Sequence, residues 1–186
     1  MINNPEFIID SNILIESHRV DYGFDICPGF WELMSRAFKS GIVLSHQKVL
    51  NELRKSNDEL SKWAKGMPKT CFPGETEQEF AVYHDLCAWA ANQQYKQPAI
   101  VRFCDVDYAD PWICAKAKVM GLTLVTQEVS APYSRKDIKL PDACGSVDVP
   151  CINKYELLRR LSARFVLDDD RCLMGRVDSG LNRVAC

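Results

Sequence analysis

The chain has 186 residues, of which 23 are basic and 25 are acidic, and 47% of its residues are hydrophobic. This length favours one domain with a sizeable core, and the nearly balanced charge excludes a basic nucleic-acid coat and a highly charged disordered chain. The N-terminal residues lack a basic stretch followed by a long apolar one, so we expect no secretory signal. No apolar run approaches the ~18 residues of a membrane span. We therefore expect a cytoplasmic protein that does not enter membranes.

The nine cysteines carry no functional argument. Their number is odd, and no two of them have the Cys-x-x-Cys spacing of zinc ribbons or of thioredoxin-like redox sites. Free cysteine packs as a small hydrophobic residue. We therefore expect reduced, mostly buried thiols rather than disulfides or a metal framework.

Short apolar runs alternate with helical patterns in the first third of the chain. Residues 7–9 are all apolar and stop at an aspartate, as a central parallel strand buried on both faces does. Apolar residues recur at helical spacing across residues 30–38. Residues 42–44 predict a second buried strand, and a helix with its apolar face at residues 49–53 follows it.

Two further helices are predicted in the middle of the chain. A short helix near residues 60–63 precedes a loop that is rich in proline and glycine. The next helix begins at Thr76, with Glu79 completing a capping box. We expect its buried stripe to consist of Phe80, Tyr83, Cys87 and Ala91.

The pair Asp110-Pro111 predicts another helix start, with the aspartate as the cap and the proline at the first helical position. Gly121 ends this helix, and residues 122–125 predict the next strand. A last strand is expected at residues 149–152, before a helix that Asn153 caps. Its inward side chains are expected to be Leu157, Leu158, Leu161 and Phe165.

The alternation of short apolar strands with helices predicts an α/β protein, because parallel neighbours in a sheet need crossover helices between them. We expect a mainly parallel central sheet in one domain that spans residues 1–167. Residues 168–186 have no apolar period and contain three successive aspartates, so they are expected to form a C-terminal tail.

Four acidic residues follow strands or lie on the helices after them: Asp10, Glu52, Asp110 and Glu128. In a parallel sheet the functional crevice lies beyond the carboxyl ends of the strands, so these side chains could converge there. Converging carboxylates repel one another unless a cation compensates them. Oxygen ligands without His or Cys favour a hard ion such as Mg²⁺ or Mn²⁺. This pattern suits metal-assisted hydrolysis of a phosphodiester bond.

Each acid also has a structural interpretation. Asp10 could form only an Asx turn, and Asp110 could serve only as a helix cap. Glu52 could lie on a solvated helix face, and Glu128 could belong to a polar loop. The functional hypothesis therefore depends on the joint pattern of the four acids.

Asn12 and Thr126 lie where a carboxamide and a hydroxyl could orient water or a ligating carboxylate. A turn residue and a strand end are equally good interpretations of these two positions. Trp112 and Trp63 could stack on bases, but Trp112 lies in an amphipathic helix and is expected to be part of the core.

Clusters of basic residues flank two of the acids. They include Arg54 and Lys55 after Glu52, and Arg135 and Lys136 after Glu128. Such clusters could form a track for phosphates into the site. A charge run is also typical of an ordinary solvated face.

The order of these segments resembles that of PIN-domain proteins. It is carried by residues 7–12, Glu52 in its helix, residues 109–117 and residues 124–128. More narrowly, the chain resembles the PIN-like family DUF4411, because Leu-Pro-Asp-Ala-Cys at residues 140–144 matches a later element of that family. The resemblance spans approximately residues 7–165 and leaves the tail out.

The resemblance implies a three-layer α/β/α fold and a metal-dependent ribonuclease centre. It implies that the acids Asp10, Glu52, Asp110 and Glu128 hold Mg²⁺ or Mn²⁺ and catalyse RNA cleavage, with Asp142 competing with Glu128 for the fourth position. It further implies the toxin of a toxin–antitoxin pair, with a cognate antitoxin as partner and a homodimer as a common state. The alternative is a catalytically silent PIN-like module that binds RNA or protein.

Overall fold

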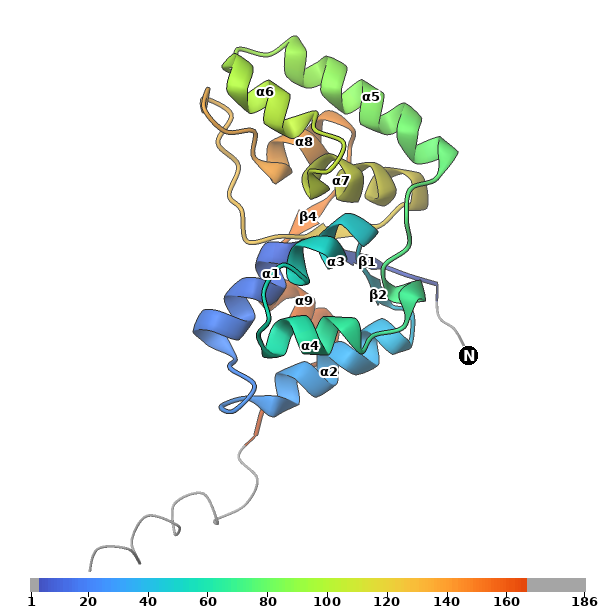
Figure 1. Ribbon diagram of the computed structural model, residues 1–186, viewed down its shortest axis with the longest axis vertical. Helices are drawn as coiled ribbons and strands as arrows, with labels where there is room; N and C mark the ends of the chain where they lie inside the picture. Colours follow the sequence, from blue (N-terminus) through green and yellow to red (C-terminus); the bar gives the residue numbers. More distant parts are fainter. Residues whose placement is uncertain (1–3, 167–186) are drawn as a thin grey trace, which may run out of the picture.

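The computed structural model describes residues 4–166 and shows an α/β fold (Figure 1). Its sheet has the strands β1 (Phe7–Ile9), β2 (Val43–Leu44), β3 (Thr123–Val125) and β4 (Cys151–Ile152). Their order is β2-β1-β3-β4, and each neighbouring pair is parallel. The expected mainly parallel sheet is therefore confirmed. The proposed tail, residues 168–186, lies outside the described residues.

Helices lie on both sides of this sheet and make it the middle of three layers. Figure 1 shows α5, α6, α7 and α8 on one side of the strands, and α2, α4 and α9 on the other. The α-helices within residues 4–166 are α1 (Ser11–Glu16), α2 (Pro28–Lys39), α3 (Gln47–Leu53), α4 (Glu59–Lys65), α5 (Glu77–Ala91), α6 (Gln97–Phe103), α7 (Ala109–Met120), α8 (Leu140–Ser146) and α9 (Lys154–Arg160). Short runs of π-helix (Ser17–Asp21) and 3₁₀-helix (Lys69–Cys71) complete the description.

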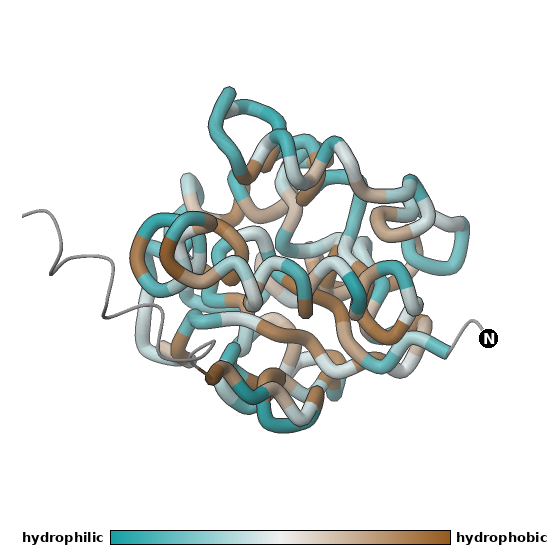
Figure 2. Tube along the Cα trace, turned by 90° about the horizontal axis from the view of Figure 1, so that it is seen from below, coloured by the Kyte–Doolittle hydropathy of each residue, from teal (hydrophilic) through white to brown (hydrophobic). Residues whose placement is uncertain are grey.

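The core forms between the sheet and the helices that pack on it. All three residues of β1 are buried, as a strand covered by helices on both faces must be. Trp112 of α7 is fully buried and stacks on Tyr83 of α5 with their ring centroids 4.3 Å apart, so the expected core role is confirmed. Figure 2 shows hydrophobic segments concentrated inside the molecule and hydrophilic ones at its edges.

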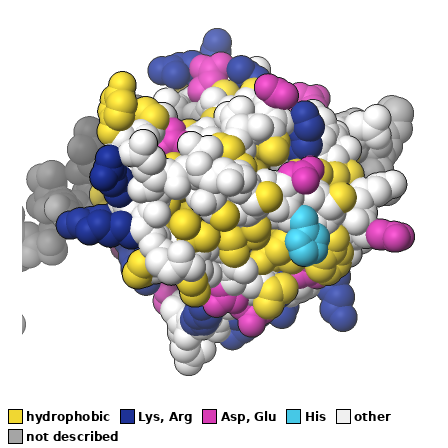
Figure 3. Space-filling view, turned by 90° about the horizontal axis from the view of Figure 1, so that it is seen from above, with side chains coloured by type: hydrophobic (Ala, Val, Ile, Leu, Met, Phe, Trp, Pro, Cys, Tyr) yellow, Lys and Arg dark blue, Asp and Glu magenta, His cyan; other side chains and the backbone are white. Residues whose placement is uncertain are grey.

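The apolar face of α2 also belongs to this core. Phe30, Met34 and Phe38 are each at most 2% exposed, so this face is not available for a dimer contact. Hydrophobic side chains do reach the surface elsewhere, as the space-filling view in Figure 3 shows on the side of the molecule over α5 and α6. Within residues 4–166, none of the helices combines the length and the apolar character that crossing a bilayer requires.

In the predicted buried stripe of α5, Tyr83 is confirmed, and the other three positions are wrong by one residue. The buried residues are Glu79, Tyr83, Leu86 and Ala90, whereas Phe80 is 45% exposed and Ala91 is exposed. Thr76 caps the helix as predicted, since its hydroxyl accepts from the Glu79 backbone N–H. The Glu79 carboxylate, however, binds Lys116 of α7. The buried ion pair therefore selects the face that α5 turns inward.

Two other local predictions are also corrected. Helix α7 begins at Ala109 after Tyr108, so Asp110 lies inside the first turn and is not the cap. Pro111 is tolerated at the third position because the first N–H groups of a helix have no partner within it. Helix α9 starts after Asn153 as predicted but ends at Arg160, and Phe165 is 43% exposed.

The cysteines within the described residues are free, as expected, but fewer than half of them are buried. The seven cysteines within residues 4–166 are all free. Three of them, Cys71, Cys114 and Cys144, are buried, and the other four are partly buried. The thiols of Cys114 and Cys144 lie 3.2 Å apart without forming a disulfide. Cys172 and Cys186 lie outside the described residues.

A buried polar cluster connects α3, α5 and α7. Lys116 Nζ lies 2.6 Å from Glu79 Oε1 and donates to the Gly74 carbonyl at 2.9 Å. Burial lowers the pKa of His46 to about 3, so its ring is neutral at pH 7. Because His46 Nδ1 accepts from the Lys48 backbone N–H, Nε2 carries the proton and faces Glu79 Oε2 at 3.9 Å.

We predict that Lys116→Met destabilises the protein strongly, because it leaves the buried Glu79 carboxylate without its cation. The free energy of unfolding should fall by about 3–5 kcal/mol, as measured by urea denaturation. The double variant Glu79→Leu/Lys116→Met should regain most of the loss. Lys118→Met on the same helix is the matched control, because Lys118 is 44% exposed. Equal stabilities of the Lys116 and Lys118 variants would contradict this account.

Candidate functional site

Asp10 and Thr126 meet at the carboxyl end of the sheet. In the register of β1 and β3, Ile9 lies opposite Val125, so the residues that follow these strands emerge side by side. The Thr126 hydroxyl donates to Asp10 Oδ2 at 3.0 Å, and the Asn12 backbone N–H donates to Oδ1 at 3.4 Å. The Asp10 side chain therefore caps α1, where the structural interpretation expected an Asx turn, and the residue that follows β3 also holds it.

Asp10 is buried, and it forms no ion pair within residues 4–166. It is 1% exposed, and burial raises the pKa of its carboxyl group to about 6. The hydrogen bonds from Thr126 and Asn12 oppose this rise, whereas the negative charges of Glu128 and Glu52 add to it. The carboxylate is thus held in place by hydrogen bonds, but its charged form is disfavoured by its surroundings.

Asp110 lies close to Asp10, in the first turn of α7. This helix packs on both β1 and β3. The pKa of Asp110 is raised to about 8, first by burial and then by the charge of Asp10, with further contributions from Glu128 and Glu52. A hydrogen bond from the side chain of Tyr108 lowers it. The four predicted acids therefore act on one another through space.

Glu52 and Glu128 approach this pair from two other elements. Glu52 is half-buried on α3, a helix that contacts both α1 and α7. Glu128 Oε2 accepts from the Leu140 backbone N–H at 2.8 Å, and Lys139 Nζ lies 3.5 Å from Oε1. The Glu128 backbone N–H also donates to the Thr126 hydroxyl at 3.1 Å. Thr126 therefore connects the segment that carries Glu128 to the Asp10 carboxylate.

Asp142 has a different position. Its carboxylate accepts from the Ser130 hydroxyl and from the Ala131 backbone N–H, and so it fastens the loop that follows Glu128. Burial raises the pKa of Tyr95, and the charge of Asp142 adds to this rise. Between the two candidates for the fourth acid, it is therefore Glu128 whose charge acts on both Asp10 and Asp110.

Hollows open on both sides of Glu128. One, of about 390 Å³, is lined in part by Asn12, Arg19 and Gln127. The other, of about 430 Å³, is lined in part by Thr126 and Tyr155. The side chain of Glu128 is 22% exposed, so a molecule in either hollow could reach it.

The predicted basic residues Arg54, Lys55, Arg135 and Lys136 are all exposed. The guanidinium of Arg135 donates to Gln94 Oε1 at 2.7 Å.

The sequence analysis did not identify two residues near the acids. Arg19 lines one of the hollows, and the side chain of Tyr108 forms a hydrogen bond with Asp110. Arg19 follows a helix that was not predicted, and for Tyr108 the only signal was its place two residues before Asp110.

The donor chemistry of the four acids suits a hard divalent cation. The ion pairs within residues 4–166 include one between Glu128 and Lys139, but none that involves Asp10, Glu52 or Asp110. No group of three or more His, Cys, Asp or Glu side chains in this part of the chain is arranged to hold a metal ion. An ion at this site would therefore require the carboxylates to turn, and Glu128 would also have to leave its contacts with α8 and Lys139.

Fold and site together define a three-layer α/β protein with a cluster of acids near the carboxyl ends of β1 and β3, of which Asp10 is buried and Asp110 partly buried. A family model described as "Domain of unknown function (DUF4411)" matches residues 7–165. The chain therefore belongs to the DUF4411 family, as the sequence predicted. A search of the curated proteins and one of the solved structures find no match.

We predict that Asp110→Asn stabilises the metal-free protein at pH 8. The folded-state pKa of this acid, about 8, lies above its ordinary value of 3.8, so wild type loses stability as the pH rises from about 4 to about 8. The neutral variant avoids this loss, and its free energy of unfolding at pH 8 should exceed that of wild type by an amount on the order of 3 kcal/mol. At pH 4 the difference should largely vanish.

Urea denaturation in EDTA at both pH values measures this difference. Asp85→Asn is the matched control, because Asp85 is exposed on α5 and its neutralisation should change stability little at either pH. An Asp110→Asn variant that is less stable than wild type at pH 8 would show that the native fold favours the charged carboxylate.

Proposed function

We propose that this protein hydrolyses phosphodiester bonds of RNA with the help of Mg²⁺ or Mn²⁺. The observation that supports this most directly is the uncompensated burial of Asp10 beside Asp110, with the charges of Glu52 and Glu128 acting on both. Burying carboxylates close together destabilises the fold because their negative charges repel each other. A bound dication would offset this destabilisation. The resemblance to PIN-domain proteins supports RNA as the substrate.

Asp10, Glu52 and Asp110 form no ion pair within residues 4–166, and we expect them to hold the ion. Their side chains would have to turn towards it, because no three acids in this part of the chain are arranged for a metal ion as they stand. When bound, such an ion lowers the pKa of water and stabilises the negative charge that develops on phosphate oxygens. Thr126 fixes one oxygen of Asp10, and Tyr108 holds Asp110 by its side-chain hydrogen bond. Glu128 lines two hollows and would position a water molecule or a further ligand.

Positive charge near the site would attract the phosphates. Arg19 lines the hollow that also reaches Glu128, while Arg54 and Lys55 follow the helix that carries Glu52. The net charge of the chain is −2, so the attraction for a polyanion would have to come from a local track of this kind.

The nuclease hypothesis predicts metal-dependent cleavage by wild type and its loss in the site variants. Labelled single-stranded and structured RNAs are incubated with purified protein in Mg²⁺, in Mn²⁺ or in EDTA, and the products are resolved on a gel. Asp10→Asn and Asp110→Asn should lower the cleavage rate at least a hundredfold, since each removes a ligand charge. Asp85→Asn, which neutralises an exposed acid on α5, should cleave like wild type.

Cleavage that survives in both site variants, or that persists in EDTA, would refute the assignment of the site. Products formed equally from RNA and from DNA of the same sequence would retain the site but remove the preference for RNA.

A binding module without hydrolysis is the second candidate. It is favoured by the contacts of Glu128, whose carboxylate is already engaged by the Leu140 N–H and by Lys139. On this alternative the wild type binds RNA or a protein partner, yields no products in either metal, and shows no rise in melting temperature on addition of Mn²⁺.

The same resemblance supports a toxin that acts with a cognate antitoxin. Expression of wild type in a bacterial host is expected to arrest growth, whereas expression of Asp110→Asn is not. Co-expression of the antitoxin should restore growth. A wild type that is abundant, active on RNA in vitro and harmless without any antitoxin would remove the toxin role and leave the nuclease proposal intact.

A further inference from the structure

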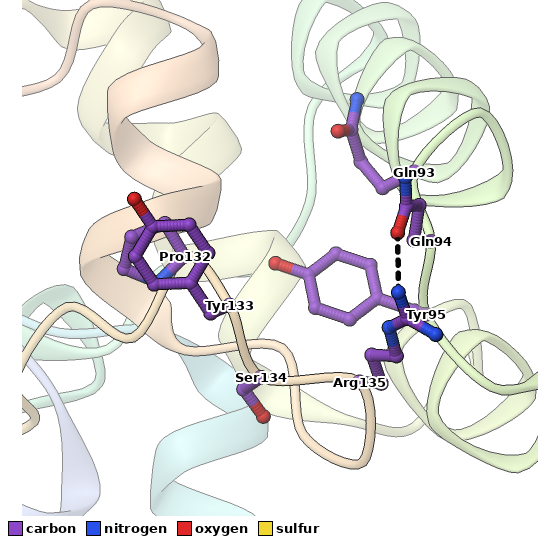
Figure 4. Close-up of a pocket in the computed structure, with 7 residues that line it drawn as sticks. All are labelled: Gln93, Gln94, Tyr95, Pro132, Tyr133, Ser134 and Arg135. Carbon is purple, nitrogen blue, oxygen red and sulfur yellow. Dashed lines mark hydrogen bonds between the residues drawn. The ribbon is translucent and has the colours of Figure 1, made fainter.

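A separate cavity of about 330 Å³ lies away from the acidic site (Figure 4). One wall is formed by Gln93, Gln94 and Tyr95, which connect α5 to α6. The other wall is the segment from Pro132 to Arg135, in the loop between β3 and α8. Its volume is near the lower end of the ~300–1,000 Å³ range that small-molecule sites occupy.

The lining combines aromatic rings with hydrogen-bonding side chains. Tyr133 is 96% exposed, and Tyr95 is half-buried against the edge of Trp89, with ring centroids 5.9 Å apart. Figure 4 shows the Tyr95 ring between the two walls, with its hydroxyl pointing towards the side where Tyr133 lies. The Arg135 guanidinium donates to Gln94 Oε1 at 2.7 Å and so joins the walls.

The loop wall is anchored at several points. Its start is fastened by Asp142, which accepts from the Ala131 N–H at 2.9 Å, and Ser134 N–H donates to the Ala131 carbonyl at 2.8 Å. Its far end is tied to the opposite wall, because Lys96 N–H donates to the Arg135 carbonyl at 2.7 Å. The site is therefore largely formed before a ligand binds, and binding would cause little further loss of conformational entropy in the loop.

We propose that this cavity binds one unpaired base of the RNA substrate, an inference that rests on the proposed function. An exposed tyrosine ring offers a face for stacking, which any base can use. The carboxamides of Gln93 and Gln94 supply both donors and acceptors, as the edge of a base requires. Arg135 adds the positive charge that the adjacent phosphate needs.

The position of the cavity suits a strand that also enters the acidic site. Tyr133 follows Glu128 by five residues in the same loop, so an extended chain places them at most about 18 Å apart. A base bound here would lie a few nucleotides from the bond to be cleaved. A base in a duplex is paired and stacked, so this site selects single-stranded RNA.

Binding is measured by fluorescence anisotropy of a labelled 12-nucleotide single-stranded RNA in EDTA, where no metal-dependent cleavage occurs. Tyr133→Ala should weaken binding about five- to a hundredfold, as the loss of one stacked base does. Tyr133→Phe keeps the ring and should bind like wild type. Val101→Ala is the control for loss of an exposed apolar side chain, since Val101 is 60% exposed on α6. A duplex RNA of the same length should bind equally to all four proteins.

Tyr133 is almost fully exposed, so Tyr133→Ala should fold normally, and its melting temperature checks this. Equal affinity of Tyr133→Ala and wild type for the single strand would overturn the proposal, as would a wild type without measurable affinity for it. An equal loss for single strand and duplex would also overturn it, because stacking on an unpaired base cannot explain that result. If Tyr133→Ala is the only one of the four proteins that binds the single strand weakly, and wild type cleaves no RNA, the base site is supported and the nuclease function is refuted.

Discussion

The pairing of β1 with β3 sets the central constraint of this structure. Their register brings the residues after Ile9 and Val125 side by side, and Asp10 is thereby buried against the Thr126 hydroxyl. Helix α7, which packs on the same two strands, adds Asp110 next to it. Asp10 is buried and Asp110 is partly buried. Two such acids repel each other and destabilise a fold unless a proton or a cation accompanies them. The pKa values of about 6 and about 8 express this conflict in the metal-free protein.

The order and type of the main elements could be predicted from the sequence because each leaves a local pattern. The apolar run at Phe7–Ile9 identifies a strand that is covered on both faces, and the aspartate after it marks the edge where the crevice forms. Interactions between distant residues leave no such pattern. The inward face of α5 was misplaced because Lys116, 37 residues further along the chain, binds Glu79. Short helices such as α1, α6 and α8 are stabilised mainly by packing, and six or seven residues carry too little periodicity to reveal them.

The positions of the candidate acids could also be predicted from local patterns in the sequence, but the contacts of each acid could not. Acids at strand ends and helix starts can be identified from position alone, whereas the partner of each acid depends on the tertiary fold. The sequence gives no indication that Tyr108 binds Asp110 or that the α8 backbone engages Glu128. The loop between β3 and α8 connects these features, since it begins at the acidic site, is fastened by Asp142 and forms one wall of the tyrosine-lined cavity. If the proposed functions hold, this one segment contributes to both hydrolysis and recognition of the RNA strand.

The proposal depends on a bound dication that offsets the repulsion between the carboxylates of Asp10 and Asp110. It is tested most directly by soaking crystals of the wild-type protein in millimolar Mn²⁺ at pH 8 and calculating the anomalous difference map. The account predicts a peak within coordination distance, about 2.2 Å, of oxygens from Asp10 and Asp110, with Glu52 or its water molecules completing the shell. A well-ordered site without a Mn²⁺ peak, while the ion occupies only surface carboxylates elsewhere, would contradict it.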